Sequence, residues 1–187
     1  MSLLKNKKAT RLSPTAINTS KLTHIVTPIK NKVVIFHGIN SFSYYKKGND
    51  IFEEALHIVK KKYRDHIKVI TVESVPYKQY IEAYNSAHIL LDQLYSHDQG
   101  YNALEAMAKG KVVFTGAGDY FTEHYNLKKT VAINATPDPV DIANKLEYLI
   151  ENKNEIITIS KNAREFVEQE HHYIKIAQKY LDIWKKA

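Results

Sequence analysis

Residues 89–115 read ILLDQLYSHDQGYNALEAMAKGKVVFT, and this stretch decides the fold. Its two apolar runs, residues 89–91 and 112–115, have the length of strands that are buried on both faces. Between them, the pattern of residues 100–109 predicts a helix that a glycine opens. A strand, a helix and a second strand in this order indicate two parallel strands joined by a right-handed crossover.

The same alternation continues on both sides of this unit. It predicts further strands over residues 32–36, 67–72 and 130–133, and further helices over 50–63, 77–86, 139–152, 155–170 and 172–186. We therefore expect a doubly wound, Rossmann-like α/β domain over residues 31–187, with a parallel sheet flanked by helices. Residues 1–30 show no sustained period and are expected to form a basic tail or hinge.

Composition excludes several classes of protein. The chain contains no cysteine, which removes disulfide frameworks and thiolate metal sites. The net charge of +7 arises from the first 49 residues, which contain nine lysines and arginines and no acid. Because this excess lies in a leading tail and one early loop and not across a folded face, we expect no nucleic-acid partner. No apolar run reaches the roughly 18 to 20 residues of a membrane span, and no secretory signal follows Met1. The expected location is cytoplasmic, without a transmembrane segment.

Ligands of doubly wound domains bind beyond the carboxyl ends of the strands, which here directs attention to residues 37–49, 73–77, 93–102 and 115–121. The sequence contains no G-x-G-x-x-G, no G-x-x-x-x-G-K-[ST] and no H-E-x-x-H. These absences exclude a dinucleotide fingerprint, a P-loop and a zincin-type metal site. The adjacent His171 and His172 are expected at the surface or in packing rather than on a metal.

The helix that Gly100 opens is the best candidate for ligand binding. Its first N–H groups, at residues 101–103, have no partner within the helix and point toward the ligand crevice, where a pyrophosphate or sugar oxygen could bind. Glu105 lies in the next turn, and its carboxylate can accept two hydrogen bonds from a vicinal diol such as a ribose. An alternative is that Gly100 only makes a turn and Glu105 only complements the helix dipole.

Residues 104–113, LEAMAKGKVV, resemble the donor loop of retaining family-4-type glycosyltransferases (glycosyl transferases group 1), which have the two-domain GT-B fold. Further segments resemble the same family in order along the chain: residues 16–22, 34–38, 47–48, 74–77, 84–89 and 92–94. The resemblance spans about residues 14–187. It implies the C-terminal, donor-binding domain, with the N-terminal acceptor domain missing from this sequence.

The resemblance also implies roles for single residues. Glu105 would hold the ribose, Lys47 would neutralise the diphosphate, and Tyr77 would border the base. The full set of implied donor-binding residues is Gly38, Lys47, Pro76, Tyr77, Gly100, Tyr101, Asn102, Ala103 and Glu105. Because a fixed ammonium and helix N–H groups can stabilise a diphosphate leaving group, no metal and no cofactor are expected.

Two positions depart from the family pattern. The family usually has another glutamate eight residues before the one at 105, and His97 occupies that position here. His97 is therefore the only candidate for a catalytic position, although a lone loop histidine is more often polar surface. The arginine that is usual near the first loop is also absent, since residues 37–48 contain none. Lys47 would then carry the phosphate charge unaided.

The predicted function is transfer of a sugar from a nucleoside diphosphate to an acceptor, in cell-surface polysaccharide synthesis. The parent enzyme is expected to be peripheral at the inner face of the membrane, and this chain alone to be inactive or weakly active. A lobe of a nucleotide-sugar epimerase or phosphorylase and a non-catalytic nucleotide-binding module remain as alternatives. The base, the sugar, the acceptor and the oligomeric state stay open.

The last predicted helix carries an apolar stripe formed by Tyr173, Ile176, Ala177, Tyr180, Leu181 and Trp184. In the enzymes that the chain resembles, the closing helix crosses back to the other lobe. We therefore expect Tyr180 or Trp184 to lie partly exposed in the chain by itself.

Overall fold

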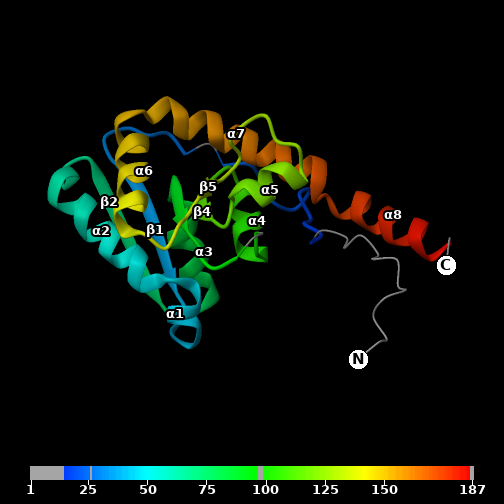
Figure 1. The fold of residues 1–187 in the computed structure, drawn as a ribbon, viewed down its shortest axis with the longest axis horizontal. Coiled ribbons are helices and arrows are strands. Elements are labelled where there is room, and N and C mark those ends of the chain that lie inside the picture. Colours follow the sequence, from blue (N-terminus) through cyan, green and yellow to red (C-terminus); the bar gives the residue numbers. More distant parts are fainter. Residues whose placement is uncertain (1–14, 26, 97–98, 186–187) are drawn as a thin grey trace.

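Five parallel strands form one sheet in the computed structural model, which describes residues 15–25, 27–96 and 99–185 (Figure 1). Their order is β2-β1-β3-β4-β5, so the chain winds one way from β1 to β2 and the other way from β3 onward. The strands are β1 (Val33–Ile39), β2 (Ile67–Glu73), β3 (Ile89–Leu91), β4 (Val112–Thr115) and β5 (Ile133–Asn134). The expected doubly wound sheet is confirmed, and β1 and β3 flank the point where the order reverses.

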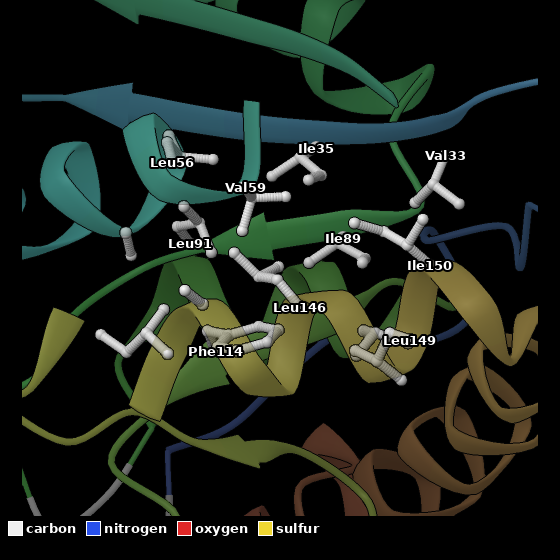
Figure 2. Close-up of a cluster of buried hydrophobic side chains, with 14 of the residues drawn as sticks. Val33, Ile35, Leu56, Val59, Ile89, Leu91, Phe114, Leu146, Leu149 and Ile150 are labelled. Carbon is white, nitrogen blue, oxygen red and sulfur yellow. The ribbon is translucent and has the colours of Figure 1, made fainter. Parts of the chain in front are cut away.

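Helices cover both faces of the sheet. The helices α2 (Asn49–Tyr63) and α6 (Pro139–Glu151) pack on one face, where Ile35, Leu91 and Phe114 point toward them (Figure 2). The helices of the other face are α3 (Tyr77–Asn85), α4 (Tyr101–Ala108) and α5 (Asp119–His124). Because side chains alternate along a strand, the neighbouring Phe36 and Leu90 enter this second core. Burial on both faces explains the continuous apolar runs of β1, β3 and β4.

Four short elements differ from the sequence prediction. The 3-10 turn η1 (Ser41–Ser43), helix α1 (Tyr44–Lys47) and helix α5 were not predicted, because each is too short to show a helical period. The last strand was expected over residues 130–133, but β5 comprises only Ile133 and Asn134, which pair with the last two residues of β4.

Packing on the domain begins earlier than residue 31. Ile17 is fully buried; its N–H donates to the carbonyl of His171 at 2.7 Å, and its carbonyl accepts from the N–H of Tyr173 at 3.0 Å. The guanidinium of Arg164 donates to the carbonyls of Leu22 and Ala108, at 2.6 Å each, and to that of Thr19 at 3.1 Å. The segment expected to be a hinge is thus attached to this domain at residues 15–25.

The two closing helices are α7 (Lys153–Glu170), which lies beside α4 and α6, and α8 (Tyr173–Trp184), which extends away from the body (Figure 1). The exposed fractions of Tyr180 and Trp184 are 45% and 70%, so the predicted exposure of the apolar stripe is confirmed. Within the described residues, no helix combines the length and hydropathy that a membrane span requires.

Candidate functional site

The candidate site lies at the carboxyl edge of the sheet, where β1 and β3 end side by side. Gly38, near the end of β1, is packed directly under Tyr80, and a Cβ at Gly38 would come within 2.6 Å of that ring. The close approach of Tyr80 therefore requires a glycine at this position. The hydroxyl of Tyr80 in turn donates to Oδ1 of Asn102 at 3.0 Å, which connects α3 to the first turn of α4.

A buried carboxylate occupies the centre of this edge. Asp92 directly follows β3, and its Oδ1 accepts from Lys47 Nζ at 3.3 Å and from Asn102 Nδ2 at 3.0 Å. The main chain of Lys47 is also attached here, because its carbonyl accepts from the N–H of Leu94 at 3.1 Å. The structure thus brings together two of the loops that the sequence singled out, the one after β1 and the one after β3.

Gly100 is the N-cap residue of α4, and its backbone is extended. Because glycine has no side chain, it provides no capping group for the first N–H groups of the helix. Its carbonyl accepts from the N–H of Leu104 at 3.0 Å and so starts the helical hydrogen-bond series. Ala103 is buried beneath this turn, whereas Tyr101 is exposed. The start of α4 and the ammonium of Lys47 lie close together, because Asn102 and Lys47 donate to the same oxygen of Asp92. A helix N-terminus and an ammonium can each attract an anion.

Glu105 lies half-buried one turn into α4. Burial raises the pKa of its carboxyl, while the charge of Lys109 and a hydrogen bond from Tyr101 oppose the rise. Glu105 is also near Tyr80: burial raises the pKa of that phenol to about 12, and the charges of Asp92 and Glu105 contribute to the rise. Glu105 lies three residues after Asn102 on α4, so it shares a helix face with the residue that contacts Asp92.

Pro76 and Tyr77 stand at the start of α3, the helix that carries Tyr80. Pro76 is the N-cap residue of this helix, and Tyr77 is exposed. Burial and the charge of Glu105 raise the pKa of Tyr101, and Tyr77 is close enough to add to this rise. Tyr101 and Glu105 are thus neighbours on α4.

Sequence reasoning missed two members of the cluster. Asp92 was seen only as part of a family-like segment, although a carboxylate directly after a fully buried strand is itself a signal. Tyr80 gave no signal that distinguishes it from an ordinary apolar position of α3. His97, the candidate catalytic position, lies outside the described residues.

The described part of the chain contains no group of three or more histidine and acidic side chains placed to hold a metal ion. His171, one of the adjacent histidines, is buried, and its Nδ1 lies 2.9 Å from the carbonyl of Thr15. Its ring also packs against Phe166. His171 therefore has the packing role that the sequence favoured.

Comparisons with known proteins agree with this architecture. The C-terminal domain of the glycosyl transferase group 1 protein LpcC from Francisella tularensis has a TM-score of 0.59 at 20% identity, over 84% of this chain and 99% of that domain. Sucrose-phosphate synthase from Thermosynechococcus elongatus has a TM-score of 0.67 at 18% identity, and HepE from Anabaena, solved with UDP, 0.65 at 16% identity. The matches cover 94% and 92% of this chain, but only 52% and 56% of those two proteins.

These likenesses show the fold, a Rossmann-like domain of the kind found in GT-B glycosyltransferases. Among curated proteins, none matches the sequence. The family model described as "Glycosyl transferase-like" matches residues 37–182, a range that includes the whole sheet edge from Gly38 to Glu105. The chain therefore belongs to the glycosyl transferase-like family.

Proposed function

We propose that this chain is the donor-binding half of a glycosyltransferase that transfers a sugar from a nucleoside diphosphate to an acceptor. The observation that carries the proposal is the convergence of Lys47, the uncapped start of α4 and Glu105 on one sheet edge. HepE, which shares the fold, has been solved with UDP and with UDP-glucose, and this supports a nucleoside diphosphate sugar as the donor.

The chemistry follows from where charge develops. When the bond between the sugar and the diphosphate breaks, the departing oxygen gains negative charge. The ammonium of Lys47 and the N–H groups at the start of α4 stabilise that charge without a metal ion. Glu105 accepts hydrogen bonds from the ribose hydroxyls, and the exposed ring of Tyr77 stacks on the base. The acceptor is held by a second domain, in an enzyme of polysaccharide synthesis at the inner face of the membrane.

Calorimetric titration of the chain with UDP in the presence of EDTA tests this proposal. We expect binding without divalent metal, and we expect Glu105→Ala to weaken it by about 1–3 kcal/mol, the usual scale of a lost hydrogen bond to a charged group. Glu54→Ala, which removes an exposed carboxylate from α2, is the matched control and leaves the affinity unchanged. Equal affinities of the wild type and a folded Glu105→Ala variant would contradict the assignment of Glu105.

A further inference from the structure

We infer that Asp92 is a positioning residue, whose buried carboxylate holds the ammonium of Lys47 next to the start of α4, ready for a diphosphate. The inference rests on the proposed function, and it extends that function to a residue that contacts no ligand itself. It starts from an asymmetry of exposure: the side chain of Asp92 is 2% exposed, whereas that of Lys47 is 28% exposed. The fixed end of the pair is therefore the carboxylate.

The main chain of Asp92 is fixed by the sheet. Its N–H donates to the carbonyl of Phe114 at 3.0 Å, which extends the hydrogen bonding between β3 and β4 by one residue. A buried carboxylate is costly unless donors satisfy it, and Lys47 and Asn102 both donate to the same oxygen, Oδ1. The two donors must then lie side by side, one from the loop after β1 and one from the first turn of α4.

Asn102 is fixed at both ends of its amide. Its Nδ2 donates to Asp92, and its Oδ1 accepts from the hydroxyl of Tyr80. This side chain is occupied within the protein, so the contribution of Asn102 to an anion is its backbone N–H at the start of α4. Asp92 therefore determines the distance between that N–H group and the ammonium of Lys47.

Lys47 keeps donors for a ligand after it has bound Asp92. An ammonium has three N–H groups, one of them donates to Asp92, and the partly exposed side chain leaves the others free to meet phosphate oxygens. Gly48, with φ 72°, packs against Leu94 so closely that a Cβ would come within 2.3 Å of it, which keeps the α1 loop against the segment after β3. Without Asp92, the four-carbon stem of Lys47 would have to be ordered by the ligand itself.

Two opposite effects of the negative charge of Asp92 can be told apart. A carboxylate that merely masks Lys47 weakens diphosphate binding, so its removal tightens binding. A carboxylate that positions Lys47 strengthens diphosphate binding, so its removal weakens binding. The burial of Asp92 and its second donor, Asn102, favour positioning, because the charge is satisfied within the protein and Lys47 is directed by it.

Titrations of Asp92→Asn with UDP and with uridine decide between masking and positioning of Lys47. We expect the affinity for UDP to fall about tenfold and that for uridine to change less than about twofold, since only the diphosphate uses Lys47. Lys47→Ala should behave alike, and the double variant should bind UDP no more weakly than Lys47→Ala, because the two side chains act as one unit. Asp65→Asn, an exposed carboxylate at the opposite edge of the sheet, is the control.

Unchanged or tighter UDP binding by Asp92→Asn would overturn the inference, as would equal losses for UDP and uridine, or additive effects in the double variant. Where Asp92→Asn does not fold, Asp92→Glu replaces it, because the longer side chain keeps the charge but displaces Lys47. It should show the same selective loss of UDP affinity.

A second measurement needs no nucleotide. In the NMR spectrum of the ligand-free protein, the side-chain amide of Asn102 should be protected from exchange in the wild type and in Lys47→Ala, and lose this protection in Asp92→Ala, which removes the accepting oxygen. If the wild type binds no UDP, the proposed function fails, and this readout alone then decides whether Asp92 organises the edge. Asn102 signals that are identical in the wild type and in Asp92→Ala would overturn the inference.

Discussion

Lys111 is a buried ammonium at the start of β4, the end of the strand away from the candidate site. Its Nζ donates to Thr27 Oγ1 at 3.0 Å and to the carbonyl of Asn85 at 2.8 Å, which links the N-terminal segment to the end of α3. Burial, with a contribution from the charge of Lys109, lowers the pKa of Lys111 from 10.5 to about 8. The folded state therefore releases this proton more easily than the unfolded chain does.

This difference in pKa predicts how stability depends on pH. Between pH 8 and 10.5 the unfolded chain binds more protons than the folded protein, because burial disfavours the charged form of Lys111. The folded state therefore loses stability as the pH falls through this window. The free energy of unfolding should rise with pH there, by up to about 1.4 kcal/mol per pH unit. Urea unfolding at several pH values should give a smaller rise for Lys111→Met, while Lys161→Met, an exposed control, keeps the wild-type rise. Equal slopes for the wild type and Lys111→Met would contradict the assignment.

At the same scale, the sequence singled out Glu105 from the glycine-opened helix and Lys47 from the family resemblance, and their ligand contacts stay predictions. The structure places Lys47 beside the start of α4 through Asp92 and Asn102. The position of Asp92 after a buried strand is a signal, but its partners and those of Tyr80 could not be predicted, since they depend on β1 and β3 being neighbours and on α3 lying over Gly38. Strand order is a property of the whole sheet and leaves no trace in the residues around position 92.

At the scale of elements, α8 shows how a helix can be predicted without its environment. Its apolar period is clear in the sequence, but most of the stripe is exposed, and within α8 only Ile176 is buried. The strands β1, β3 and β4 are the opposite case, since continuous apolar runs predicted both their existence and their burial. Short α1 and α5 escaped prediction because a period needs at least two turns to be visible.

Alanine substitutions along α8 should separate its inner and outer parts. Ile176→Ala removes a side chain that is 1% exposed, and we expect a loss of about 2–4 kcal/mol in the free energy of unfolding. Leu181→Ala removes one that is 44% exposed and should change it by no more than about 0.5 kcal/mol. Urea unfolding followed by circular dichroism measures both. A larger loss for Leu181→Ala than for Ile176→Ala would show that the outer part of α8 packs in solution.

At the scale of the whole molecule, residues 15–25 join the N-terminal part of the chain to the C-terminal helices. The guanidinium of Arg164, on α7, binds carbonyls of this segment and of α4, and Ile17 forms a bridge beside His172, where α7 gives way to α8. The pattern of apolar residues predicts only helices and strands, so a segment that shows neither pattern is interpreted as a linker. Its packing depends on donors and apolar pockets that distant residues provide, and these cannot be predicted from the segment itself.

Ile17→Ala tests whether this N-terminal segment is part of the folded body. Ile17 is fully buried, so the substitution should lower the free energy of unfolding by about 2–4 kcal/mol. Because the carbonyl of Ile17 accepts from the N–H of Tyr173, hydrogen exchange at the amide of Tyr173 should also become faster. The exposed Thr23 provides the control, and Thr23→Ala should leave both quantities unchanged. A segment that only rests on the surface predicts a different result: wild-type stability and wild-type exchange at Tyr173 in the Ile17→Ala variant.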